Sequence, residues 1–223
     1  MNLLLLAVAP VFIVIIYIYY KDKYEKEPKR FLLSNFLLGA IVSIIVTTII
    51  YYIIGTVIEF NRGSVFQQFI YAFFVVGLSE EFSKYIIVRY FAQPSKQFDE
   101  PFDGIIYAVM VSMGFAATEN IFYVLESGYQ TALLRAFTAV PAHATFGILM
   151  GYFMGKAKFS KNKALLNLTG LLLASGFHGA YDFFLFIDFI PGIWLGAFIS
   201  LIVAIILSRK AIKRHQASSN FKP

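Results

Sequence analysis

Long apolar runs separated by short polar segments dominate the pattern along the chain. The runs cover approximately residues 3–20, 31–58, 65–88, 104–125, 133–155, 164–186 and 192–208. An α-helix needs about 20 apolar residues to cross the hydrocarbon core of a bilayer, and most of these runs are that long. The pattern therefore predicts an all-α fold, a polytopic bundle of about seven transmembrane helices in a lipid bilayer.

Composition supports the membrane class and narrows the chemistry. The hydrophobic fraction is 59% and the mean hydropathy is +0.71, whereas soluble domains are about 45–50% apolar. The chain has no cysteine, which excludes disulfides, a thiol nucleophile and cysteine-ligated metal sites. Any chemistry must come from carboxylate, imidazole, amine, hydroxyl or amide groups.

The positions of the basic residues indicate how the chain is oriented in the membrane. The net charge of +6 comes mainly from Lys and Arg in the segments 21–30, 156–163 and 209–214, whereas residues 126–131 carry no basic residue. By the positive-inside rule this predicts an outside N-terminus and a cytoplasmic C-terminus, and the excess charge needs no nucleic-acid partner. The first run lacks a basic start and a small-residue cleavage site, so we expect a retained anchor. Residues 1–223 form one predicted domain.

Three charged residues lie inside the third apolar run. Glu80 and Glu81 are adjacent, and Lys84 follows one helical turn later. At about 100° per residue, the lysine lies between the two carboxylates on the helix surface and can reach either of them. One carboxylate is in excess. Carboxylates inside a membrane are costly and usually mark a functional site, although a Glu–Lys pair can also be purely structural.

Further polar residues lie in the next three runs. Glu119 and Asn120 are in the fourth, His143 is in the fifth, and His178 with Asp182 is in the sixth. The i, i+4 spacing allows Asp182 to hold one ring nitrogen of His178 and leave the other for substrate. Each of these residues can also have a purely structural role. Glu119 can form a hydrogen bond with Asn120, and a lone buried histidine often only hydrogen-bonds its neighbours. We expect one shared cavity, with the catalytic helices within about 65–186.

Small residues on the fifth run predict close helix packing. Ala139, His143, Gly147, Gly151 and Gly155 repeat every four residues and so share one helix face. This places His143 on a buried stripe.

Common hydrolase signatures are missing from the sequence. It contains no Gly-x-Ser-x-Gly, His-Glu-x-x-His, Gly-x-Gly-Asp or phosphate-binding loop motif. Serine, HExxH-type zinc and aspartyl intramembrane proteolysis and nucleotide hydrolysis therefore lack support, and glutamate and histidine chemistry remains.

The ordered motifs carry a family resemblance. Glu80-Glu81-Phe-Ser-Lys84, Phe115-Ala-Ala-Thr-Glu119-Asn120, His143 and His178-Gly-Ala-Tyr-Asp182, with the early Asp22-Lys-Tyr-Glu-Lys-Glu-Pro28, resemble the PrsW family of bacterial intramembrane proteases. That family is similar in turn to the CAAX prenyl endopeptidases and the Abi immunity proteins. The similarity extends from the first polar segment to the sixth run.

The resemblance implies a function and roles for these residues. It implies a multi-pass protease of the bacterial cell membrane that performs site-1 cleavage of a single-span anti-sigma factor, which leads to release of an extracytoplasmic-function sigma factor. Glu80 and Glu81 would be the essential carboxylates, one of them activating water, and His178 the essential histidine. Our own hypothesis from the residues is that His143 or His178 stabilises the oxyanion, with Glu119 and Asp182 in the catalytic group and Lys84 and Asn120 in support.

Metal dependence and two other functions stay open at the level of sequence. Glu119, His143, His178 and Asp182 offer enough nitrogen and oxygen donors for zinc, while a glutamate with His178 can also work without metal. A proton- or cation-coupled transporter would use the same polar residues as a relay, although no inverted repeat is visible. A non-enzymatic Abi-type immunity or scaffold protein is the third alternative. Nothing in the sequence fixes the oligomeric state.

Overall fold

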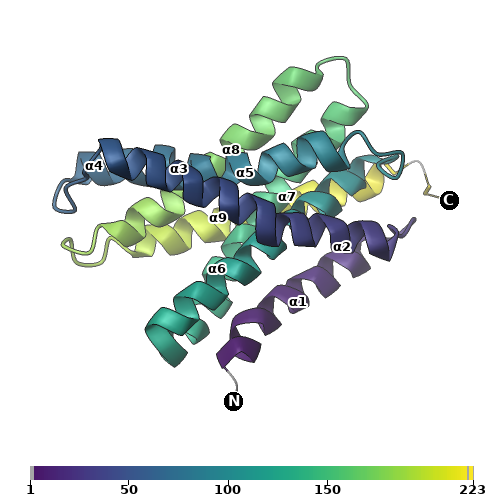
Figure 1. Ribbon diagram of the computed structural model, residues 1–223. Helices are drawn as coiled ribbons and strands as arrows, with labels where there is room; N and C mark the ends of the chain where they lie inside the picture. Colours follow the sequence, from purple (N-terminus) through teal and green to yellow (C-terminus); the bar gives the residue numbers. More distant parts are fainter. Residues whose placement is uncertain (1–2, 220, 223) are drawn as a thin grey trace.

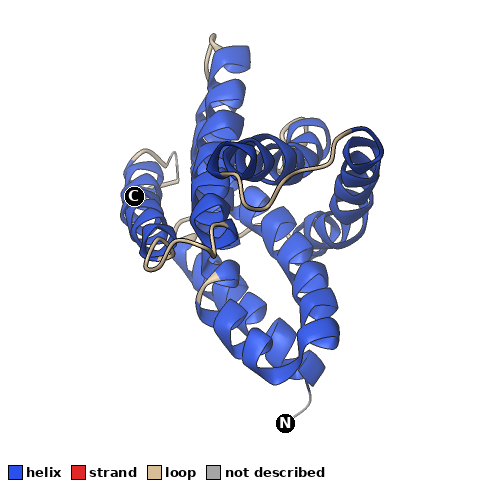
Figure 2. Ribbon diagram, turned by 90° about the vertical axis from the view of Figure 1, so that its left-hand side faces the viewer, coloured by secondary structure: helices blue, strands red, loops and turns tan. Residues whose placement is uncertain are grey.

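The computed structural model describes residues 3–219 and 221–222, and across these residues the regular structure is entirely helical (Figure 2). The elements along the chain are α1 Leu3–Lys21, α2 Lys29–Leu38, η1 Gly39–Ser43, α3 Ile44–Val57, α4 Val65–Ile70, η2 Tyr71–Gly77, α5 Leu78–Ile87, η3 Val88–Ala92, α6 Pro101–Phe137, α7 Ala139–Lys158, α8 Lys163–Phe186 and α9 Leu195–Ala217. The predicted all-α bundle is confirmed.

Three π-helical segments join shorter helices into long continuous ones. The segment η1 connects α2 to α3, so that residues 29–57 form one run, and η2 and η3 flank α5 within residues 65–92. These runs match the predicted ones at 31–58 and 65–88. Because a π segment shifts the side chains that follow it around the helix, η2 sets the direction of the polar face of α5.

The chain reverses direction within α6, which the apolar runs did not predict. Gly128 has φ 77° and ψ −157°, a backbone conformation that residues with a Cβ rarely adopt, and the helix is interrupted there. Ala132 packs with Val124 and Arg135 contacts Glu119, so residues 129–137 fold back along the preceding part of α6 as a hairpin arm. The predicted helix at 133–155 therefore begins earlier and is interrupted at Thr138, before α7.

The first half of α6 is the centre of the bundle. Its residues from Phe102 to Ala117 are all buried, and α1, α2 and α7 pack around it (Figure 1). The predicted stripe on α7 makes this possible: a Cβ added at Gly151 would lie 2.2 Å from the Gly104 carbonyl oxygen, and one at Gly155 would lie 2.1 Å from that of Pro101. Only glycine allows backbones to approach so closely.

The surface of the bundle suits a bilayer. Four helical stretches, Leu3–Lys21, Lys29–Val57, Pro101–Lys158 and Leu195–Ala217, are long and apolar enough to cross a membrane. Large apolar side chains such as Ile13, Ile49 and Ile199 point outward from them. The number of spans and the orientation of the termini stay predictions. The last helix continues to Ala217, beyond the end of the apolar run at 192–208.

Candidate active site

The charged residues of α5 form a buried ion-pair cluster. The Lys84 ammonium lies 2.7 Å from Glu81 Oε1 and 3.5 Å from Glu80 Oε2, as the helical spacing predicted. All three side chains are buried, and Glu81 is fully excluded from solvent. Tyr51 of α3 donates a hydrogen bond of 2.9 Å to Glu80 Oε1, which leaves Glu80 Oε2 without a hydrogen bond.

Close helix packing brings this cluster to α8. A Cβ at Gly77, at the end of η2, would lie 2.8 Å from the backbone nitrogen of Gly179, so the two helices almost touch beside His178. A hydrogen-bond chain on the other side of α5 ties it to α2–α3: Ser83 contacts Ser43 at 2.5 Å and accepts from Thr47 at 2.9 Å. The position of Glu80 is thus fixed from both sides.

His178 is held between carboxylates. Its Nδ1 lies 2.9 Å from Glu81 Oε1, and its Nε2 lies 3.2 Å from Asp182 Oδ2 and 3.7 Å from Glu80 Oε2. The ring also stacks on Phe146, with centroids 4.9 Å apart. Asp182 does hold one nitrogen, as the spacing suggested. The second nitrogen is directed at Glu81, whereas the sequence had assigned it to substrate.

His143 links α7 to α5 and α6. Its Nε2 lies 2.9 Å from Glu119 Oε2, and its Nδ1 lies 3.3 Å from the Lys84 ammonium. Glu119 in turn accepts a hydrogen bond of 2.6 Å from Arg135 on the hairpin arm. The cluster is therefore continuous from α5 through α7 to α6.

Asn120 has a different neighbourhood. It accepts from Arg135 at 2.7 Å and donates 3.1 Å to the backbone oxygen of Ala7 in α1. The suggested Glu119–Asn120 partnership is replaced by a shared contact with Arg135, and Asn120 fixes α1 and the hairpin arm.

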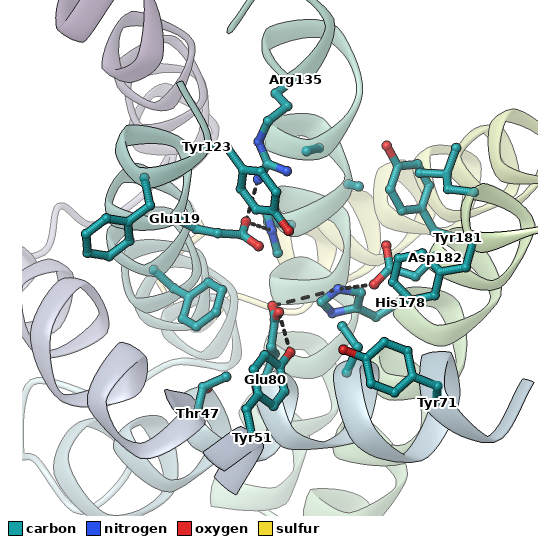
Figure 3. Close-up of a pocket in the computed structure, with 18 of the residues that line it drawn as sticks. Thr47, Tyr51, Tyr71, Glu80, Glu119, Tyr123, Arg135, His178, Tyr181 and Asp182 are labelled. Carbon is teal, nitrogen blue, oxygen red and sulfur yellow. Dashed lines mark hydrogen bonds and ion pairs between the residues drawn. The ribbon is translucent and has the colours of Figure 1, made fainter. Parts of the chain in front are cut away.

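Most of these residues line one cavity of about 1070 Å³ (Figure 3). Its wall includes Glu80, Glu119, His143, His178 and Asp182, whereas Glu81, Lys84 and Asn120 stand behind the wall. The cavity extends to residues 58–62 and 185–188, at the end of the bundle away from the basic segments. The expected shared cavity is present, and it separates the two adjacent glutamates into one that faces the space and one that does not.

Two residues of the site were missed from the sequence. Arg135 lies within a predicted apolar run. Because an arginine in a membrane is as costly as a glutamate, its position in the sequence could have marked it as a candidate site residue. Its guanidinium also lies 4.0 Å from the ring centroid of Tyr123. Tyr51 gave no signal, because tyrosine is common in membrane helices; only the fold brings its hydroxyl to Glu80.

Glu80, His143 and His178 also form a candidate metal centre. Each offers a donor atom, and the three atoms lie within 4.8 Å of one another. The second ring nitrogen of each histidine contacts a carboxylate, Glu119 or Glu81, which is the usual outer-shell arrangement of metal-bound histidines. The unbonded Glu80 Oε2 is a suitable third donor. The donor set of two histidines and one glutamate fits zinc.

Comparison with known proteins identifies the family. The model of the family described as "PrsW family intramembrane metalloprotease" matches residues 27–213. The chain belongs to the PrsW family. It is 38% identical to Protease PrsW of Geobacillus kaustophilus over 198 residues, which are 88% of this chain and 85% of that protein. Protease PrsW of Clostridioides difficile is 37% identical over 215 residues, covering 93% and 87% of the two chains.

PrsW membership settles the class of the protein. Protease PrsW of Bacillus subtilis is likewise 38% identical over 180 residues, which cover 80% of both chains. Together with the membrane-spanning helices, these relatives make the chain a multi-pass membrane peptidase of bacteria, as the motifs predicted. No solved structure matches the chain.

Proposed function

We propose that this PrsW protein performs site-1 cleavage of a single-span anti-sigma factor and thereby starts the release of an extracytoplasmic-function sigma factor. The family supports the peptidase activity. The cavity supports the side of cleavage, because it extends toward the end of the bundle opposite the basic segments. With the positive-inside orientation, that end faces away from the cytoplasm.

The observation that carries the mechanism is the difference between Glu80 and Glu81. Glu80 lines the cavity and keeps Oε2 free of hydrogen bonds. Glu81 is completely buried and does not line the cavity. Its Oε1 is occupied by Lys84 and His178, and its Oε2, which also has no hydrogen bond, is not open to the cavity. We therefore assign the water-activating role to Glu80 and a positioning role to Glu81, which the sequence alone left undivided.

The catalytic steps follow from this assignment. Glu80 Oε2 takes a proton from a water molecule in the cavity, and the water oxygen forms a bond to the scissile carbonyl carbon. The N–H at His178 Nε2, which contacts Asp182 at 3.2 Å in the resting site, exchanges this contact for the oxyanion and stabilises it. Glu80 then returns the proton to the departing nitrogen as the C–N bond breaks. The Tyr51 hydroxyl and the Lys84 ammonium hold the Glu80 carboxylate in place throughout.

A zinc-dependent site is the alternative form of the mechanism, in which Glu80 binds the ion instead of accepting the proton. Glu80, His143 and His178 would hold the ion, and zinc when bound supplies a Lewis acid that polarises the scissile carbonyl. The charges favour this arrangement: four carboxylates, Glu80, Glu81, Glu119 and Asp182, meet the two cations Lys84 and Arg135. With neutral histidines, the excess of two negative charges equals the charge of one zinc ion.

Substrate access requires a locally unwound segment. Peptide bonds within a transmembrane helix are shielded by their own hydrogen bonds. A single-span substrate must therefore present an extended stretch, which the cavity can admit near Phe60 and Asp188. A juxtamembrane segment on the outer side of an anti-sigma factor fits this requirement.

Co-expression with a tagged single-span anti-sigma factor tests the proposal. The wild type is compared with Glu80→Gln and His178→Ala, and with Glu126→Gln, an exposed control, at equal membrane levels. A shortened fragment is expected only with the wild type and the control. Normal cleavage by Glu80→Gln would refute the mechanism, and absence of a fragment from every one of several anti-sigma factors would refute the substrate class. Loss of cleavage with chelator and recovery with zinc would favour the metal form.

A further inference from the structure

A second cluster of acidic side chains lies at the opposite end of the bundle from the cavity mouth. It joins the loop between α1 and α2 to the start of α6, and its members are Asp22, Glu25, Glu27, Asp99, Glu100 and Asp103. Four of them are almost fully buried: Asp22, Glu100 and Asp103 are 1% exposed and Glu27 is 4% exposed. Acidic loop residues normally remain in water, so their burial requires a compensating partner.

Helix capping accounts for only part of this loop acidic cluster. Glu100 and Asp103 form a capping box at the start of α6, in which Asp103 Oδ2 accepts from the backbone N–H groups of Asp99 at 2.7 Å and Glu100 at 2.8 Å. The other carboxylate oxygen of Asp103 is buried without a hydrogen-bond donor. Capping leaves Asp22 and Glu27 unexplained.

Asp22 is the clearest sign of a missing partner. Neither of its carboxylate oxygens is in a hydrogen bond of normal geometry. The Lys26 ammonium and the Glu27 backbone amide partly offset the negative charge of Asp22, whereas Glu100 adds a repelling charge. The Lys26 ammonium itself is bonded to the backbone oxygens of Tyr19 and Asp22. Asp22 is therefore a buried carboxylate that lies near another carboxylate and lacks hydrogen-bond partners for both oxygens.

Glu27 and Asp103 lie beside each other. Their carboxyl groups are within hydrogen-bonding range of each other, an arrangement that two ionised acids cannot keep unless a proton or a cation lies between them. The Tyr107 hydroxyl donates to the other side of Glu27.

The positive charges nearby do not balance the cluster. Against its six carboxylates stand Lys26 and Lys158, and the Lys158 ammonium is bonded to the backbone oxygens of Gln93 and Ser95. If all six carboxylates are ionised, four negative charges remain in excess, and a proton shared by Glu27 and Asp103 would reduce the excess to three. Its donors are all oxygens, which suits Mg²⁺ and Ca²⁺, whereas the nitrogen-containing active site suits zinc.

We propose that Asp22, Glu27 and Asp103 bind a hydrated divalent cation, Mg²⁺ or Ca²⁺, that ties the loop between α1 and α2 to the start of α6. Among the residues that the structure describes, only Glu80, His143 and His178 bring three donors within 4.8 Å of one another. An ion at the loop acidic cluster would therefore contact at least one of the three carboxylates through a bound water molecule, and Mg²⁺ usually keeps several such waters. The site is independent of the proteolytic chemistry.

Binding can be measured without any substrate. The purified chain in detergent is stripped with chelator, and terbium is added as a luminescent probe of carboxylate sites, excited through nearby tyrosines such as Tyr107. Mg²⁺ and Ca²⁺ are then added in competition. The variants are Asp22→Asn and Asp103→Asn, with Glu126→Gln as an exposed control and Glu80→Gln to exclude the active site. Thermal unfolding with and without each ion is recorded in parallel.

The expected result is saturable terbium luminescence in the wild type, Glu80→Gln and Glu126→Gln, displaced by millimolar Mg²⁺ or Ca²⁺. We expect at least a tenfold weaker response in Asp22→Asn and Asp103→Asn, together with loss of the thermal stabilisation by the ions. Equal binding by folded Asp22→Asn would overturn the proposal. Absence of binding in the folded wild type would overturn it as well and leave a shared proton between Glu27 and Asp103.

Discussion

Replacing each of the two adjacent glutamates by glutamine should separate catalysis from stability. In Glu80→Gln, the Tyr51 hydroxyl can still donate to the side-chain oxygen, and Lys84 keeps its 2.7 Å contact with Glu81. The main loss is the proton acceptor at Oε2. General-base catalysis contributes about 10²–10⁴-fold to a rate. We therefore expect cleavage to fall by about that factor while the free energy of unfolding changes by less than about 1.5 kcal/mol.

In Glu81→Gln the balance is reversed. Glu81 is 0% exposed and accepts from both Lys84 at 2.7 Å and His178 at 2.9 Å. Its neutralisation leaves Lys84 paired only with the more distant Glu80 carboxylate at 3.5 Å. Breaking a buried pair by removing one partner typically costs about 3–5 kcal/mol. We expect a loss of stability of that order, with loss of activity following from the displaced His178.

The assay is unfolding of both purified variants in mixed micelles of increasing SDS content, followed by circular dichroism, beside cleavage of a tagged substrate by the same preparations. Glu126→Gln serves as the exposed control in both measurements. Equal stability of the two glutamine variants, or a greater loss in Glu80→Gln, would refute the assignment of Glu81 as the positioning residue and Glu80 as the residue facing the water.

Three further predictions concern other parts of the structure. Arg135→Ala removes the 2.6 Å contact with Glu119, so we expect at least tenfold slower cleavage with Arg135→Lys partly restoring it, measured with the same substrate. Gly151→Val places a Cβ 2.2 Å from the Gly104 carbonyl, and should unfold at markedly lower SDS content. Burial raises the pKa of Asp22 to about 6, so the folded state binds its proton more tightly than the unfolded state does. Without divalent ions, wild-type stability should fall as the pH rises from about 4 to about 6, and Asp22→Asn should lack that part of the slope.

Each of these predictions has a contradicting outcome. Full activity of Arg135→Ala would mean that Glu119 and His143 need no support from the hairpin arm. A wild-type midpoint for Gly151→Val would mean that α6 and α7 are not in direct backbone contact. Identical pH profiles for wild type and Asp22→Asn would mean that the Asp22 carboxylate is solvated.

The sequence predicted the helices well because a bilayer imposes a simple rule on it. Apolar runs of sufficient length located every long helical stretch. Most ends agree to within a few residues, and the exceptions are the ends of α6 and α9 and the start of the run that contains α7. The break at Gly128 was missed, since a reversal within an apolar region leaves hydropathy unchanged and appears only in the backbone angle of one glycine.

The sequence predicted most of the residues that form the site but not the contacts between residues on different helices. Burial of a charged group in a membrane is costly, so Glu80, Glu119 and His178 were visible in the sequence as exceptions. Helical spacing also predicted the contacts of Lys84 within its own helix. Contacts between helices depend on how the helices rotate against each other. The link from His178 to Glu81, the Tyr51 hydroxyl at Glu80 and the pairing of Arg135 with Glu119 therefore needed the structure.

The most direct measurement is cleavage of a purified single-span anti-sigma factor by the purified chain in liposomes, with the products identified by mass spectrometry in water enriched in ¹⁸O. The wild type should yield one cut on the outer side of the substrate's membrane span and one ¹⁸O atom in the new carboxylate, and folded Glu80→Gln should yield neither. Cleavage by Glu80→Gln at the wild-type rate, or a product without ¹⁸O, would contradict hydrolysis by a water molecule that Glu80 activates.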